Sequence, residues 1–322
     1  MARFNDFQPA GVIPATLLVF NEDLSIDEAA TASHLKDVAA VDGISAITVN
    51  GHASEVHACN FDEQRRILDL TLDEIGGQLP VINGVYQDGS LEAARIARMA
   101  EQAGASCLLI FPPHSIGYGN GVSRPEMILS HFKTIADATD LPFIAFQYPV
   151  AKNYAYPIET LVRMAEEIPS FRAIKDSCND PVRHELHIRT LQNLSRPVNV
   201  LSTHSAWLMA SLSLGCAGLL SGSGSVIADL QVALFNAVQD GDLTLAQAIN
   251  DRIQPTAKCF YADPTCDMHN RMKEALVMLG RLPRATVRPP LFKLSDTEIA
   301  GIKEAIKAAG LTRQGAVPEA AE

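Results

Sequence analysis

The chain has 322 residues, 47% of them hydrophobic and 20% charged, with a formal net charge of −11 at pH 7. These proportions are typical of a globular protein and exclude disordered and coiled-coil chains. The acidic balance argues against a nucleic-acid partner, because phosphate contacts need a basic surface. No apolar run reaches the ~18 residues of a membrane span, and no signal-peptide core opens the chain. We therefore expect a cytoplasmic protein with no membrane partner.

Apolar runs rich in β-branched residues alternate with longer amphipathic stretches. The pattern predicts strands over residues 11–20, 44–50, 80–86, 106–111, 142–148, 171–176, 197–202 and 217–221. It predicts helices over residues 27–41, 62–77, 89–104, 123–139, 157–168, 181–194, 205–215 and 226–240. Ser25, Asp62 and Ser90 stand where the N-caps of three of these helices are expected.

Eight strand–helix units predict a (β/α)8 TIM barrel, because strands separated by helices form parallel sheets. A doubly wound dinucleotide-binding sheet is the alternative, but no Gly-x-Gly-x-x-Gly follows the first strand. Further helices over 244–262, 267–280 and 295–309, with no strand between them, predict a C-terminal helical extension. We expect a catalytic barrel over 8–242, a three-helix extension over 243–312 and a flexible tail over 313–322.

The six cysteines are scattered along the chain without Cys-x-x-Cys spacing, which indicates reduced thiols. They are Cys59, Cys107, Cys178, Cys216, Cys259 and Cys266.

Lys175 ends the predicted sixth strand, in FRAIKDSC. Barrel enzymes place their active sites at the carboxyl ends of the strands. If the face that Lys175 shares with Ala173 and Phe171 is the barrel interior, burial favours the neutral amine. A neutral amine can attack a ketone or aldehyde and form a Schiff base. Lys175 is therefore a candidate nucleophile, although a strand-end lysine can also simply be solvated.

Several segments carry motifs in a recognisable order: GVIPATLLVFNEDLSID, NGHASE, PVINGVYQDGSLEAARIARMAEQAGASCLLIFPP, LPFIAFQYP and FRAIKDSC. Together they resemble the dihydrodipicolinate synthase / N-acetylneuraminate lyase family of pyruvate-type class I aldolases, over about residues 8–310. The resemblance implies a Schiff base on Lys175, no separate cofactor and a small-molecule 2-oxo acid substrate. It also implies a homotetramer built as a dimer of dimers.

The chain departs from the family at the residues that move protons. The family has a threonine in a Gly-Thr-Thr-Gly-Glu loop and two tyrosines beside the lysine. Those positions hold His52, Ser115 and Phe146 here, and a phenylalanine cannot transfer a proton. The proton carriers implied by the resemblance are therefore missing.

Tyr148 and His52 are the candidate replacements. Tyr148 lies two residues after Phe146 and so shares its strand face, where it either returns a phenol to the mouth or packs against the next loop. His52 has a side chain suited to acid–base chemistry near neutral pH, or it is a loop histidine bonded to a backbone carbonyl.

Other residues near the predicted mouth are expected to bind substrate. The resemblance assigns the substrate carboxylate to backbone amides of His52, Ala53 and Ser54, with the Ser54 hydroxyl as a further donor, and expects Glu55 to brace that loop. The full set of expected substrate-binding residues is Ala53, Ser54, Ser115, Phe146, Thr203, His204, Leu220 and Ser221.

Five further histidines are expected to lie away from the mouth. They are His57, His131, His184, His187 and His269. His184 and His187 share a helix face, but no third ligand is expected near them, so no metal is predicted.

The leading hypothesis is a Schiff-base lyase of aldolase, dehydratase or deaminase type, acting on pyruvate or a 2-keto-3-deoxy acid. True synthase activity is not expected, because the synthase branch has an arginine where this chain has Val150-Ala151-Lys152-Asn153. One alternative is a phosphosugar aldolase that binds phosphate at residues 221–225 (SGSGS), near a helix N-terminus. The other is a non-catalytic barrel that binds a metabolite, since the proton relay is missing.

Overall fold

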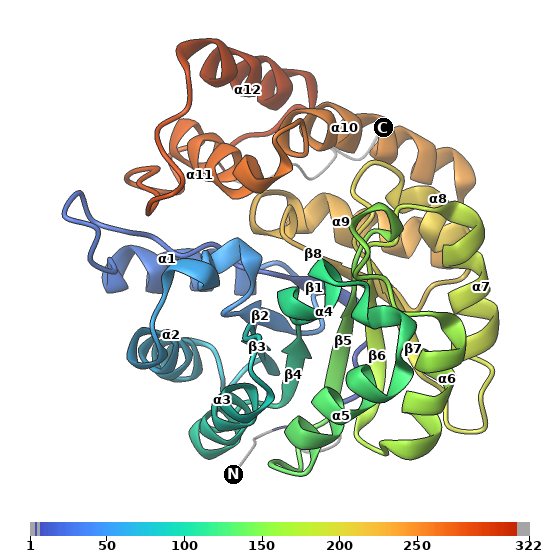
Figure 1. The fold of residues 1–322 in the computed structure, drawn as a ribbon. Coiled ribbons are helices and arrows are strands. Elements are labelled where there is room, and N and C mark those ends of the chain that lie inside the picture. The colour runs from blue at the N-terminus through green and yellow to red at the C-terminus, as the bar shows by residue number, and fades with distance from the viewer. Residues whose placement is uncertain (1–3, 5–6, 314–322) are drawn as a thin grey trace.

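The computed structural model describes residue 4 and residues 7–313, and it is a (β/α)8 barrel with C-terminal helices (Figure 1). Its parallel strands are β1 (Gly11–Pro14), β2 (Ile47–Val49), β3 (Val81–Val85), β4 (Cys107–Ile110), β5 (Phe143–Gln147), β6 (Phe171–Asp176), β7 (Asn199–Ser202) and β8 (Gly218–Ser221). They pair in the order β1-β8-β7-β6-β5-β4-β3-β2. The bridges Val12–Ile44 and Ala15–Thr48 join the two ends of this order and close the ring. The predicted fold class is confirmed.

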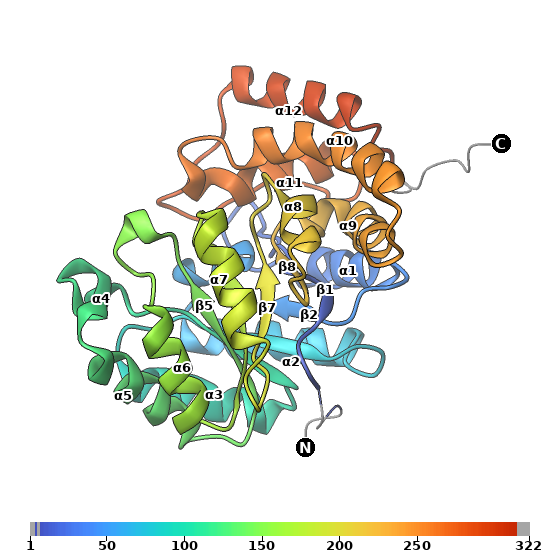
Figure 2. The ribbon, with the colours of Figure 1, turned by 90° about the vertical axis from the view of Figure 1, so that its right-hand side faces the viewer.

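The helices that follow the strands surround the barrel. They are α1 (Glu28–Ala39), α2 (Phe61–Glu74), α3 (Ser90–Ala103), α4 (His114–Tyr118), α5 (Pro125–Ala136), α6 (Ile158–Glu167), α7 (Pro181–Leu191), α8 (Leu208–Ser213) and α9 (Gly224–Gln239). The chain ends in α10 (Leu243–Phe260), α11 (Met268–Met278) and α12 (Asp296–Ala308). Figures 1 and 2 show these last three grouped together on one side of the molecule, beside α9.

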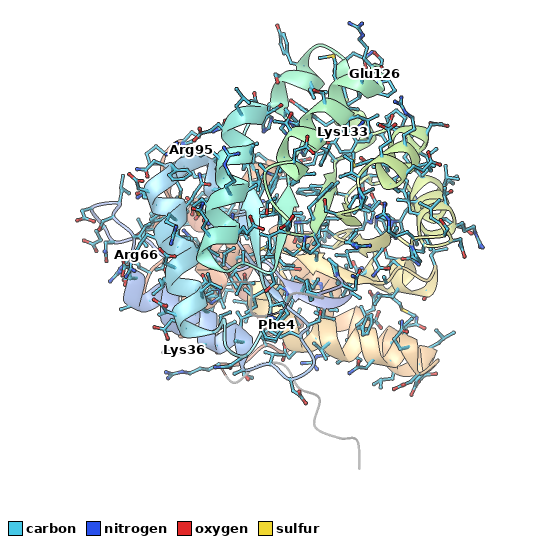
Figure 3. All side chains as sticks on the ribbon, turned by 90° about the horizontal axis from the view of Figure 1, so that it is seen from below. Phe4, Lys36, Arg66, Arg95, Glu126 and Lys133 are labelled. Carbon is cyan, nitrogen blue, oxygen red and sulfur yellow. The ribbon has the colours of Figure 1, made fainter. Side chains whose placement is uncertain are left out.

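Charged side chains line the outward faces of the surrounding helices, as the labelled Arg66, Arg95, Glu126 and Lys133 show (Figure 3). Some pair across neighbouring helices: Lys133 of α5 lies 2.5 Å from Glu167 of α6. Exposed ion pairs of this kind contribute at most ~1 kcal/mol each to stability. Burial of apolar side chains, rather than these pairs, therefore stabilises the fold. No helix in the described part of the chain is long and apolar enough to cross a membrane.

Several boundaries differ from the sequence predictions. The first strand ends at Pro14 rather than at residue 20. Residues 15–20 are buried but do not extend the strand. An apolar run shows that a segment is buried, and it does not show that the segment pairs as a strand. The N-caps of α1 and α2 are Asp27 and Asn60, not Ser25 and Asp62. The N-cap of α3 is Gly89, and Ser90 is its first residue.

The short helix α4 and the five 3-10 turns found among the described residues were not predicted, because single turns leave no periodic pattern in the sequence. Of the tail predicted over 313–322, residues 314–322 lie outside the described residues.

Candidate active site

Lys175 lies at the carboxyl end of β6, with its side chain in the barrel mouth. It is only 7% exposed, and it pairs in register with Phe146 of the adjacent strand β5. Its Nζ lies 4.4 Å from the centre of the Phe146 ring, which can interact favourably with a cation. No carboxylate forms an ion pair with Lys175 in the described part of the chain. Burial therefore lowers the pKa of Lys175 to about 7, so that a large fraction of the amine is neutral at physiological pH.

Lys175 opens into a cavity of about 550 Å3 that His52 and Tyr148 also line. The three candidate catalytic residues come from the ends of β6, β2 and β5 and meet in this one space. The lining includes no Asp, Glu or Arg among the residues that the structure describes. The cavity therefore favours an anionic or neutral small molecule over a cation.

Tyr148 and His52 form a hydrogen-bonded pair, with the phenol oxygen 3.0 Å from Nε2 of the imidazole. Burial lowers the pKa of His52 to about 3, with a further contribution from the Lys175 charge. Burial also raises the pKa of Tyr148 well above its usual value. Both groups are therefore neutral at physiological pH, and in the tautomer protonated at Nδ1 the Tyr148 hydroxyl donates to His52 Nε2.

A second pair of the same kind lies at the rim. The Tyr86 hydroxyl is 2.7 Å from Nε2 of His114, and the His114 ring also packs edge-on to Tyr154. Asp88 accepts hydrogen bonds from the backbone amides of His114 and Ser115, which fixes the start of α4. Sequence reasoning did not select Tyr154, because loop contacts that converge at a barrel mouth have no fixed spacing.

The loop that carries His52 is anchored by the C-terminal helices. Glu55 is fully buried in a left-handed conformation (φ 50°) and forms an ion pair with Lys273 of α11. Its other oxygen accepts from the backbone amide of Arg288 at 3.0 Å. Glu55 therefore braces the loop, as the sequence suggested, and it does not line the cavity.

The expected carboxylate-binding loop is a 3-10 turn over His52–Ser54. The Ser54 amide already donates to Gly51 O at 3.1 Å, and its hydroxyl donates to Thr16 O at 2.9 Å. Ser54 is therefore engaged within the protein. The amides of His52 and Ala53 stand at the open start of the turn, and both residues line the cavity.

The expected substrate-binding residues divide into two groups. Those that line the cavity are Ala53, Phe146, Thr203 and His204. Those that do not are Ser54, Ser115, Leu220 and Ser221. Leu220 and Ser221 are fully buried in β8, and Ser115 lines a different surface hollow beside α5.

His204 is held in place by protein groups. Its ring stacks on Trp207 with centroids 4.0 Å apart, and its Nε2 accepts from the Asn179 amide at 3.1 Å. Its Nδ1 lies 3.3 Å from the Ser202 hydroxyl. Burial lowers the pKa of His204 to about 3, so it presents a neutral, already hydrogen-bonded ring to the cavity.

The expectation that His269 lies away from the mouth is wrong. His269 is the second residue of α11 and lines the cavity. The C-terminal helices fold over the barrel and bring Tyr261, Thr265 and Met268 to the same wall. No local sequence pattern signals this approach, because it depends on how an extension packs against a distant barrel.

The expectation that His184 and His187 have no third ligand-type residue nearby is also wrong. Asp176 follows Lys175 on β6, faces away from the mouth and accepts from Nδ1 of His184 at 2.8 Å and of His187 at 2.7 Å. Potential ligand atoms of Asp176, Cys178, His184 and His204 lie within 4.8 Å of one another. These hydrogen bonds already use the Asp176 carboxylate, and those of His204 already use both of its ring nitrogens, so we assign the cluster a structural role.

The serine-rich loop after β8 offers little to a phosphate. The Ser221 and Ser223 hydroxyls lie 2.9 Å apart, and Ser225 donates to Ala15 O at 2.8 Å. All three serines are buried, and Gly222 is the residue of this loop that lines the cavity. The geometry therefore does not favour a phosphosugar substrate.

A (β/α)8 barrel with a buried lysine at the end of its sixth strand has the architecture of a class I aldolase. A model of the dihydrodipicolinate synthetase family matches residues 8–309, and the chain belongs to this family. Enzymes of the family form a lysine Schiff base with pyruvate and use no external cofactor.

Two curated relatives carry different names. The 4-hydroxy-tetrahydrodipicolinate synthase of Thioalkalivibrio sulfidiphilus is 30% identical over 305 residues, which cover 94% of this chain and 98% of the relative. The putative 2-dehydro-3-deoxy-D-gluconate aldolase YagE of Escherichia coli is 26% identical over 295 residues, covering 91% and 94%. The crystal structure of YagE in complex with pyruvate has a TM-score of 0.86 at 22% identity and covers 94% of this chain and 98% of that one.

We expect the rate of imine formation at Lys175 to rise with pH up to about 7 and to level off above it. Only the neutral amine attacks a ketone, and burial lowers the pKa of Lys175 to about 7. The measurement is the fraction of protein labelled after short incubations with pyruvate at each pH, quenched in one alkaline borohydride buffer and read by intact mass. A rate that keeps rising toward the ordinary lysine pKa of ~10.4 would contradict the assigned environment.

Proposed function

We propose that this chain is a Schiff-base-forming lyase acting on a 2-oxo acid, such as pyruvate or a 2-keto-3-deoxy acid. The observation that carries the proposal is Lys175, which is buried without an ion-pair partner in the described structure and shares a cavity with the Tyr148–His52 pair. The lyases named among the relatives agree with this reaction class.

The first step is imine formation. The neutral Lys175 amine attacks the keto carbon, and the resulting carbinolamine loses its oxygen as water. Tyr148, whose high pKa keeps it protonated, donates the proton that the departing hydroxyl needs. The product is an iminium cation on Lys175, and the Phe146 ring lies where it can stabilise that charge.

The second step cleaves a bond in the substrate. In a 2-keto-3-deoxy acid, the Tyr148 phenolate left by the first step takes the proton of the hydroxyl two carbons from the iminium, which restores the phenol beside His52. The carbon–carbon bond then breaks, its electrons move into the iminium to give an enamine, and an aldehyde leaves. Reprotonation of the enamine and hydrolysis release pyruvate and restore Lys175.

A synthase-type reaction, in which a second substrate brings its own carboxylate, fits this site less well. It would need a second cation, and Lys175 is the lone Lys or Arg among the described cavity-lining residues. This supports an aldolase, dehydratase or deaminase rather than a true synthase. A non-catalytic barrel is the second reading, but the convergence of Lys175, His52 and Tyr148 on one cavity favours an enzyme.

The proposal predicts that borohydride traps pyruvate or a related 2-oxo acid on Lys175. Intact mass should increase by one reduced substrate, and peptide mapping should place the label at Lys175. The Lys175→Met variant should stay unlabelled. The control variant Lys133→Met, which removes an exposed lysine on α5, should label like the unaltered protein.

Two results would reject the proposal. One is an unlabelled protein with every 2-oxo acid tried. The other is labelling that persists in the Lys175→Met variant.

Moving the phenol from residue 148 to residue 146 tests whether Tyr148 carries the proton. Tyr148→Phe should lower turnover roughly 10²–10⁴-fold, the usual contribution of general acid–base catalysis. The Phe146 and Tyr148 rings have centroids 4.6 Å apart, and Phe146 is the ring beside Lys175. Phe146→Tyr in the Tyr148→Phe background should therefore recover at least tenfold of the lost turnover.

Steady-state kinetics with the substrate that traps best, together with thermal unfolding of each variant, provides the measurement. Unchanged turnover in Tyr148→Phe would remove Tyr148 from the mechanism. Severe destabilisation by Phe146→Tyr alone would show that Phe146 is a core residue rather than a wall of the site.

A further inference from the structure

His269 is a polar residue of the cavity wall without a protein partner. Its side chain is 6% exposed, and it takes part in no hydrogen bond or ion pair among the described residues. Leaving a buried polar group unpaired costs about 1–3 kcal/mol, so such groups normally have a partner in the working molecule. The ring nitrogens of His269 can be reached from the cavity, so a ligand that displaces water from them must offer a hydrogen-bond partner in its place.

The ring of His269 is fixed against the ends of two strands. A Cβ added at Gly222, just after β8, would lie 3.3 Å from His269 Nε2 and 3.9 Å from the Ala53 Cβ. Any side chain at residue 222 would press on the imidazole, so glycine makes room for it. His269, Gly222 and Ala53 thus form one continuous patch of the wall.

This patch faces Lys175 across the barrel mouth. In the strand order, β2 stands opposite β6, and Ala53 follows β2 while Lys175 ends β6. On the other side of Lys175 the wall is the apolar ring of Phe146. A molecule bonded to Lys175 can therefore find hydrogen-bond donors toward His269 and the Ala53 amide, and not toward Phe146.

The charge of the residues around His269 favours a hydrogen-bond acceptor as its partner. No Asp or Glu stands among the described residues of the wall, and a carboxylate accepts hydrogen bonds without donating any. Burial lowers the pKa of His269 well below its usual value, so the ring is neutral and offers one N–H. The carboxylate of a 2-oxo acid is bonded directly to the carbon that Lys175 attacks, so it stays deep in the cavity with His269.

We propose that His269 binds substrate by donating an imidazole N–H hydrogen bond to the carboxylate of the 2-oxo acid held on Lys175. This inference rests on the proposed function. It gives the C-terminal helix α11 a direct part in substrate recognition, and it supplies a donor beside Ala53, whose side chain has none.

The test compares an acid with its neutral ester. Half-saturation concentrations for borohydride trapping are measured with pyruvate and with methyl pyruvate in the unaltered protein, His269→Phe and His269→Gln. Phe keeps a ring of similar size without an N–H, and Gln keeps an N–H donor. The control is His57→Phe, which changes an exposed histidine of the neighbouring turn that does not line the cavity.

For His269→Phe, we expect the half-saturation concentration to rise roughly tenfold to a hundredfold with pyruvate and less than about threefold with methyl pyruvate. His269→Gln should recover part of the loss, and His57→Phe should change neither value. Thermal unfolding establishes that each variant is folded.

Any other outcome contradicts either the role of His269 or the proposed function. An equal loss for both ligands, or no loss for either, overturns the role of His269 while leaving the lyase proposal intact. Absence of trapping in the unaltered protein rejects the proposed function, and the assignment of His269 falls with it.

Discussion

The chemistry of this barrel depends on burying one amine without giving it a counter-ion. Lys175 is placed by β6 against the Phe146 ring, and the acidic residue next to it, Asp176, faces the opposite side of the strand. Strand alternation thus separates the nucleophile from the nearest carboxylate. An ion pair at Lys175 would hold the amine protonated, so this separation is what keeps the amine reactive.

The position of the remaining groups follows from that constraint. Tyr148 and His52 provide a neutral hydrogen-bonded pair beside the lysine, so they add no charge that would raise its pKa. The Tyr148 phenol lies two residues after Phe146, the position at which the family pattern has its tyrosine. The loop holding His52 is fixed from outside by the buried ion pair of Glu55 with Lys273. The C-terminal helices therefore support the site in two ways, through Lys273 under the loop and through His269 in the wall.

The sequence predicted the repeated architecture well, and it made Lys175 the candidate nucleophile. Eight apolar runs alternating with amphipathic stretches correspond to the eight strands of the described structure, and the end of the sixth run drew attention to Lys175 before the family resemblance assigned it a role. Both signals are local, since they depend on periodicity and on the rule that barrel sites lie at strand ends.

What the sequence did not predict depends on contacts between distant segments. His269 lies about a hundred residues from Lys175 in the chain, and only the packing of α11 over the mouth brings it to the cavity. Ser54 and Ser221 have the right chemistry in the right segments, but their hydroxyls are used by Thr16 and Ser223. Which hydroxyl faces a cavity is decided by neighbours that one segment does not reveal.

A crystal structure of the protein soaked with pyruvate tests the central claim most directly. The account predicts continuous electron density from Lys175 Nζ to the former keto carbon, inside the cavity that Tyr148 and His52 line. A structure in which Lys175 stays unmodified while pyruvate occupies that cavity or another site would contradict it.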